Sequence, residues 1–95
     1  MKISFSPRAD RDLEGIFSYI SLNDIEAARR IIMRILQSIA MLEHFPRIGR
    51  VGRVANTCEL PIARLPYYAV YHFVDGTEIE VIAIMHDRQQ FPPNG

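Results

Sequence analysis

The histidines and arginines of this chain are the side chains best suited to chemistry. The histidines are His44, His72 and His86, and arginine supplies every cationic side chain except Lys2. His86 falls where an apolar run ends, and Arg88 follows two residues later. If the strand continues that far, both side chains lie on one face. An imidazole and a guanidinium placed together can act as proton donor and anion stabiliser, or bind a phosphate.

Arginine is concentrated in one segment of a chain whose formal net charge is zero. Residues 47–64 hold Glu59 as their only anion against Arg47, Arg50, Arg53 and Arg64. Since guanidinium groups make bidentate contacts with carboxylates and phosphates, the segment is a candidate site for an acidic partner. The alternative is a solvated loop whose arginines lie on the fold. The overall neutrality excludes a protein that coats polyanions by bulk charge.

Other chemistries have no sequence support. The histidines lack HxxH or HExxH spacing, and Cys58 is the only cysteine, so we expect no metal site and no disulfide. Glycine-rich nucleotide loops and serine nucleophile elbows are also missing, so no cofactor is expected. One strand is rich in aromatic side chains that suit either RNA base stacking or core packing: Tyr67, Tyr68, Tyr71 and Phe73. At strand spacing, we expect half of them to pack under helices.

Hydrophobic periodicity predicts the elements that position these residues. A short strand at Ile3–Phe5 precedes a helix that begins at Ser6-Pro7, and an Asn23–Glu26 capping box opens a second helix over 25–44. A flexible basic loop over 47–56 leads to strands over 57–64, 67–74 and 78–86. The fold class is α+β: an N-terminal strand and an α-hairpin packed on an antiparallel sheet, in the order β-α-α-β-β-β. We expect one domain over residues 1–95, with a mobile tail at 91–95.

The last two strands read as a tight hairpin. A two-residue turn at Asp75-Gly76 places His72 opposite Ile79 and pairs Ala69, Tyr71 and Phe73 with Ile82, Glu80 and Glu78. The run 81–85 is apolar on both faces, which predicts the central strand of the sheet. No apolar run reaches the roughly 18–20 residues of a membrane span, and the N-terminus lacks a signal-peptide pattern, so we expect a cytoplasmic protein with no membrane partner.

Taken in order, these segments resemble the RelE/ParE superfamily of toxins from bacterial type II toxin–antitoxin systems. The resemblance extends over residues 3–91, and its carrying segments are SPRADRDLEGIFSYI, AARRIIMRILQSIAML, FPRIGR, ELP, PYYAVYHFVDG and EVIAIMHDRQQFP. It implies a cognate antitoxin as partner, and contact with operator DNA only through that antitoxin.

The superfamily includes two mechanisms. Members similar to RelE and YoeB cleave messenger RNA on the ribosome. The residues of this chain that remain available for such a reaction are Glu59 as base, His86 as acid, and Arg64 or Arg88 as anion stabiliser. RelE-like toxins rely on lysines that this chain lacks. Asp87 also stands where a tyrosine is usual after the histidine, and its carboxylate would repel the scissile phosphate.

Members similar to ParE inhibit DNA gyrase and need no hydrolytic site, and the PRIGR loop and the IMHDR ending resemble this branch. We therefore expect a ParE-like toxin with no catalytic residues, whose target-binding residues are Arg47, Arg50, Arg53, His86 and Arg88. The alternatives are a ribosome-dependent mRNA endoribonuclease that uses Glu59, Arg64 and His86, and a toxin-like protein that has lost its toxicity.

Overall fold

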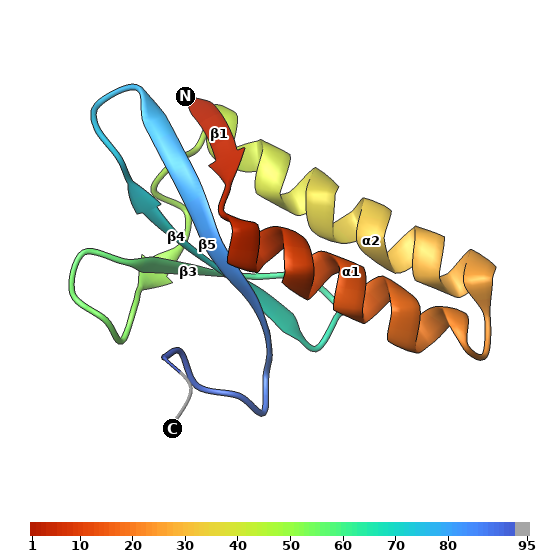
Figure 1. Ribbon diagram of the computed structural model, residues 1–95. Helices are drawn as coiled ribbons and strands as arrows, with labels where there is room; N and C mark the ends of the chain where they lie inside the picture. Colours follow the sequence, from red (N-terminus) through yellow and green to blue (C-terminus); the bar gives the residue numbers. More distant parts are fainter. Residues whose placement is uncertain (93–95) are drawn as a thin grey trace.

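Two helices lie side by side along one face of a five-stranded sheet in the computed structural model, which describes residues 1–92 (Figure 1). The predicted order is confirmed, with one short strand and one 3₁₀ turn added. The elements are β1 (Lys2–Phe5), α1 (Pro7–Ser21), α2 (Ile25–Ala40), the 3₁₀ turn η1 (Met41–Glu43), β2 (Arg50–Val51), β3 (Cys58–Pro61), β4 (Tyr67–Phe73) and β5 (Glu78–His86).

The strand order across the sheet is β1-β5-β4-β3-β2. β1 runs parallel to β5, whereas the other neighbouring pairs are antiparallel. The predicted antiparallel sheet is therefore confirmed for β3, β4 and β5, and the N-terminal strand, whose pairing the sequence did not predict, joins it in the parallel sense. β5 is an interior strand, but the central position belongs to β4.

Side-chain caps set where the two helices begin. Ser6 caps α1, its Oγ accepting from the N–H of Ala9 at 3.0 Å, with Pro7 at the first helical position as predicted. α2 is capped by Asp24, whose Oδ1 accepts from the N–H of Ala27 at 3.0 Å, so the Asn23–Glu26 capping box was wrong by one residue. α2 ends at Ala40 and tightens into η1 instead of continuing as an α-helix to residue 44.

The main core lies between the helices and the sheet. It contains Ala9, Ile35, Ile39 and Leu42 from the helical side and Leu60, Ile62, Ala69, Tyr71, Ile79, Val81 and Ile84 from the sheet side. A smaller cluster on the opposite face contains Tyr68, Val70, Ala83 and Met85, with Ile82 and Phe91 packed against it. The aromatic side chains of β4 thus divide between the two faces, and Tyr68 and Tyr71 are too deeply buried to stack on bases.

The predicted register of the β4–β5 hairpin was wrong. Asp75 Oδ1 accepts from the N–H of Thr77 (2.7 Å), the Thr77 hydroxyl (2.7 Å) and the N–H of Glu78 (3.1 Å), which makes the turn longer than two residues. His72 consequently lies opposite Glu80 rather than Ile79, with Nε2 and Oε1 2.8 Å apart. Ile82 is an extra residue on β5, a bulge that shifts the register further.

The basic segment is more ordered than a flexible loop. Arg50 and Val51 form β2 and pair with Glu59 and Cys58 of β3. β2 pairs with β3 only as far as Glu59. The rest of β3 therefore lies at an edge of the sheet, as Pro61 predicts. Of the tail expected to be mobile, Phe91 packs on the sheet, and residues 93–95 lie outside the described residues. The described part of the chain contains no helix that is long and apolar enough to cross a membrane.

Candidate functional site

The chain reverses direction directly after β5, and residues 86–90 form what we call the C-terminal turn. The N–H of Arg88 donates to His86 Nδ1 at 3.1 Å, and the N–H of Gln89 donates to the His86 carbonyl at 2.8 Å. The strand therefore does not continue to Arg88, and the shared strand face predicted for His86 and Arg88 is not formed. Tyr68 fixes the turn from the sheet, because its hydroxyl donates to the Gln89 carbonyl at 2.9 Å.

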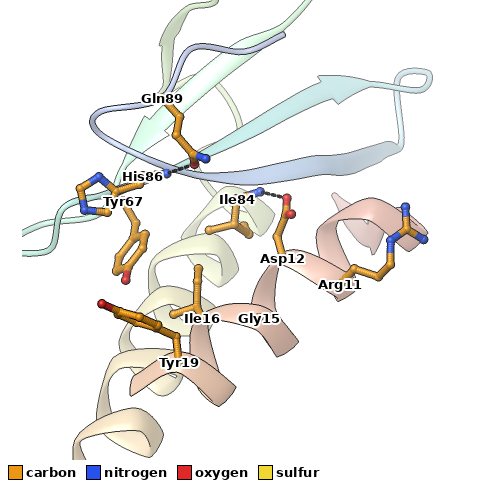
Figure 2. A pocket seen from close by; sticks show the side chains of 9 residues that line it. All are labelled: Arg11, Asp12, Gly15, Ile16, Tyr19, Tyr67, Ile84, His86 and Gln89. Atoms are coloured by element: carbon orange, nitrogen blue, oxygen red, sulfur yellow. Dashed lines mark hydrogen bonds between the residues drawn. The ribbon is translucent and has the colours of Figure 1, made fainter. Parts of the chain in front are cut away.

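A hollow of about 290 Å³ opens between α1 and the adjacent ends of β4 and β5, which we call the α1 hollow (Figure 2). It is lined by Arg11, Asp12, Gly15, Ile16, Tyr19, Tyr67, Ile84, His86 and Gln89. The rings of Tyr67 and His86 meet edge to face, with centroids 5.5 Å apart. The two phenol rings approach each other from α1 and β4 (Figure 2). Burial raises the pKa of the Tyr67 phenol, and the nearby Tyr19 raises it further.

Contacts between α1 and β5 hold the wall of this hollow. β1 pairs with β5 only as far as Val81. Beyond that point Ser6 Oγ donates to the Ile82 carbonyl at 2.7 Å, and Asp12 Oδ2 accepts from the N–H of Ile84 at 2.9 Å. Asp12 also pairs with Arg8 at 3.3 Å. The polar side chains of α1 thus take over the hydrogen bonds that a neighbouring strand would make.

A second hollow of about 290 Å³ lies among β2, β3 and the C-terminal turn, which we call the basic hollow. Arg50 pairs with Glu59 at 3.0 Å, and its guanidinium carbon lies 5.6 Å from the centre of the Tyr68 ring. Arg53 Nη1 donates to Gln90 Oε1 at 2.7 Å. The remaining lining residues are Asp87, Gln89 and Phe91. Gln89 lines both hollows, so the C-terminal turn separates them.

The structure divides the residues that the sequence singled out. Arg50, Arg53 and Glu59 lie together in the basic hollow, whereas His86 lies in the α1 hollow. The other three candidate arginines line neither hollow. The guanidinium carbon of Arg47 lies 4.6 Å from the centre of the Phe73 ring. Arg64 occupies an exposed left-handed turn position (φ 67°), and Arg88 is exposed on the C-terminal turn.

The three residues of the nuclease alternative are not in contact. Glu59 is already paired with Arg50 and retains 12% side-chain exposure, His86 lies in the α1 hollow, and Arg64 lines neither hollow. The sequence did not point to Tyr19 or Gln89. The one available signal was Tyr19, a large aromatic side chain off the apolar stripe of its helix, which is 74% exposed in the structure. Within residues 1–92, no cluster of His, Cys, Asp or Glu side chains is arranged to hold a metal ion.

The chain is similar to known proteins in both sequence and structure. Residues 3–91 match the family model described as the ParE toxin of the type II toxin–antitoxin system parDE. The chain is 36% identical over 91 residues to the Sinorhizobium fredii protein named "Putative toxin Y4kP", covering 96% of this chain and 93% of that protein.

A solved structure of the chromosomal ParDE TA system from P. aeruginosa contains a chain with the same fold. The TM-score is 0.81 and the sequence identity is 26%, over 90% of this chain and 95% of that one. A toxin of this type works with an antitoxin as its partner. The chain belongs to the ParE toxin family of type II toxin–antitoxin systems.

Proposed function

We propose that this ParE-family toxin inhibits DNA gyrase by contacting it with the basic hollow and the C-terminal turn. The observation that carries the proposal is the position of Arg53 and Arg50 on β2 and its loop, fixed by contacts to Gln90 and Glu59 beside the exposed Arg88. Guanidinium groups held in this way bind carboxylates and phosphates with little loss of side-chain freedom. Of the other target-binding residues expected from the sequence, Arg47 lies over the Phe73 ring and His86 lines the α1 hollow, so neither is part of this surface.

The surface suits binding better than hydrolysis. Arg50 pairs with one oxygen of the Glu59 carboxylate, and the N–H of Arg53 lies 3.4 Å from the other oxygen, so both oxygens already have partners within the protein. His86 faces the other hollow. Gyrase acts on chromosomal DNA, so the proposal places the toxin in the cytoplasm, in contact with operator DNA only through its antitoxin.

A supercoiling assay with purified gyrase tests the proposal. We expect the toxin to block supercoiling and to stabilise the cleaved gyrase–DNA complex. Losing one charge-assisted contact costs about 1.5–3 kcal/mol, so Arg53→Gln and Arg88→Gln should each raise the inhibitory concentration roughly tenfold or more. Arg30→Gln, an exposed change on α2, is the matched control and should leave inhibition unchanged.

Two results would overturn the proposal. One is full supercoiling, without a cleavage complex, at excess toxin. The other is ribosome-dependent cleavage of translated message that disappears in His86→Ala, which would support the endoribonuclease instead. Growth without arrest on overexpression would indicate a toxin fold that has lost its toxicity.

A further inference from the structure

The side chain of Tyr68 lies where two distant segments of the proposed gyrase surface meet. One segment is β2 and the loop after it, which carry Arg50 and Arg53, and the other is the C-terminal turn, which carries Arg88. Tyr68 is on β4, which the strand order places between β2 and β5, the strand that leads into the turn. A side chain in this position can contact both segments at once.

The ring of Tyr68 supports the first segment. The guanidinium carbon of Arg50 lies 5.6 Å from the ring centre, which is within the range of a cation–π contact. The tyrosine is 6% exposed and packs in the smaller core cluster with Val70, Ala83 and Met85. Since burial fixes the ring, it offers the guanidinium a rigid surface.

The hydroxyl of Tyr68 holds the second segment. It donates to the Gln89 carbonyl at 2.9 Å. Burial raises the pKa of this phenol, and the nearby Glu59 raises it further, so the hydroxyl is protonated at neutral pH and can donate. Gln89 lies between Arg88 and Gln90 in the chain, so this bond restrains both neighbours.

The other backbone hydrogen bonds of the turn lie within it or at its start. The N–H of His86 donates to Gln89 Oε1 at 3.0 Å, as Figure 2 shows, and the N–H groups of Arg88 and Gln89 donate back to His86. The N–H of Asp87 donates to the Pro66 carbonyl at 2.9 Å, which anchors the first residues of the turn. The phenol hydroxyl therefore ties the end of the turn to β4.

The end of the turn in turn restrains the basic loop. Arg53 Nη1 donates to Gln90 Oε1 at 2.7 Å, so a turn that moved away from β4 would release Arg53 together with Arg88. Ordering a free, rotamer-rich side chain during binding costs free energy. A turn that is already fixed reduces this cost for both arginines.

We propose that Tyr68 is a positioning residue for gyrase binding, whose hydroxyl holds the C-terminal turn so that Arg53 and Arg88 meet gyrase in a fixed arrangement. The inference rests on the proposed function, because it assigns a role at the same surface. Tyr68 is buried, so it acts through the two arginines rather than by contact with gyrase.

Amide hydrogen exchange of the free toxin tests the positioning directly. Tyr68→Phe keeps the ring and removes the bond to Gln89, so the Arg88 and Gln89 amides should exchange about three- to tenfold faster. Amides in the middle of β4 and β5 should keep their rates. Tyr67→Phe, the same change at a side chain that lines only the α1 hollow, is the matched control and should leave the turn unchanged. Turn amides that exchange equally fast in Tyr68→Phe and wild type would overturn the inference.

Surface plasmon resonance with purified gyrase tests the consequence for binding. Tyr68→Phe should raise Kd about three- to tenfold, whereas Tyr67→Phe should change it by less than about twofold. In an Arg53→Gln/Arg88→Gln background, adding Tyr68→Phe should change Kd by less than about twofold, because the hydroxyl acts through those two side chains.

This comparison excludes a merely structural effect. Circular dichroism and urea unfolding establish that each variant is folded. A general loss of stability would weaken gyrase binding by the same factor in the wild-type and the arginine-depleted backgrounds. Such an additive result would show that Tyr68 does not position the arginines.

The two measurements separate this inference from the proposed function. If wild-type toxin does not bind gyrase, the proposed function fails, while hydrogen exchange still decides whether Tyr68 holds the turn. If wild type and Tyr68→Phe bind gyrase equally well, the proposed function stands and only the positioning role fails.

Discussion

The carboxylate of Asp12, on α1, accepts a 2.9 Å hydrogen bond from the backbone N–H of Ile84, on β5. On the side of β5 away from β4, no strand lies beside Ile84, because β1 ends its pairing at Val81. The helix thus supplies the acceptor that a strand would otherwise provide, with Ser6 supplying a donor to the Ile82 carbonyl. This contact fixes α1 against the end of β5 and so forms one wall of the α1 hollow.

Replacing Asp12 should therefore destabilise the fold. Asp12→Ala leaves the N–H of Ile84 without its acceptor, which we expect to cost about 1–3 kcal/mol. Asp12→Asn keeps an acceptor oxygen and loses mainly the partly exposed pair with Arg8, so its cost should stay below about 1 kcal/mol. Urea unfolding measures both, with the exposed Glu14→Ala as control. Equal stability of Asp12→Ala and the control would show that the Ile84 hydrogen bond contributes nothing.

Tyr71 links the core to the basic segment. Its fully buried ring carries a hydroxyl that donates to the Pro46 carbonyl at 2.9 Å and accepts from the N–H of Gly49 at 3.1 Å. Tyr71→Phe leaves both groups unpaired and should lower the unfolding free energy by about 1–3 kcal/mol. Hydrogen exchange at the Gly49 amide should become faster relative to amides of β5. Unchanged exchange at Gly49 would contradict the link.

The turn between β4 and β5 should make stability depend on acidic pH. Hydrogen bonds from Thr77 and Glu78 hold the pKa of Asp75 below its ordinary value of 3.8. The ionised carboxylate therefore stabilises the fold above the unfolded-state pKa, and this contribution is lost as pH falls through the lower folded-state pKa. Asp75→Asn removes the titration but keeps an acceptor oxygen.

Urea unfolding of wild type and Asp75→Asn between neutral pH and about pH 3 measures this contribution. The stability difference between the two proteins should be constant at neutral pH and change only as the pH falls below about 4. Glu14→Gln, on an exposed surface of α1, is the control. A difference that stays constant down to the lowest pH would rule out a depressed Asp75 pKa.

The Arg50–Glu59 pair should contribute modestly to stability. The Arg50 side chain is 58% exposed, so solvent screens the pair and we expect a coupling free energy of no more than about 1 kcal/mol. A double-mutant cycle with Arg50→Gln and Glu59→Gln measures it, and the coupling should fall as salt rises. The more exposed Arg29–Glu26 pair is the matched comparison and should couple more weakly. Stronger coupling in that exposed pair would contradict the role assigned to burial.

Local patterns predicted the elements well. The apolar stripe of α1 and the Ser6-Pro7 start depend on residues within a few positions of each other, so neighbouring side chains suffice to encode them. The α-hairpin, the last two strands and the resemblance to the toxin superfamily followed from the same short-range signals. The errors fell where one side chain decides between close alternatives: Asp24 rather than Asn23 caps α2, and Asp75 lengthens the final turn.

The sequence by itself determined the helices, most of the strands, the family and the concentration of arginine near β2. Only the tertiary structure decided that β1 lies parallel to β5, that His72 faces Glu80, and that His86 and Arg53 line different hollows. Periodicity is a property of adjacent residues, whereas these relationships join positions far apart in the chain. They depend on how the helical hairpin packs on the sheet and on the hydrogen bonds that turn the chain directly after His86.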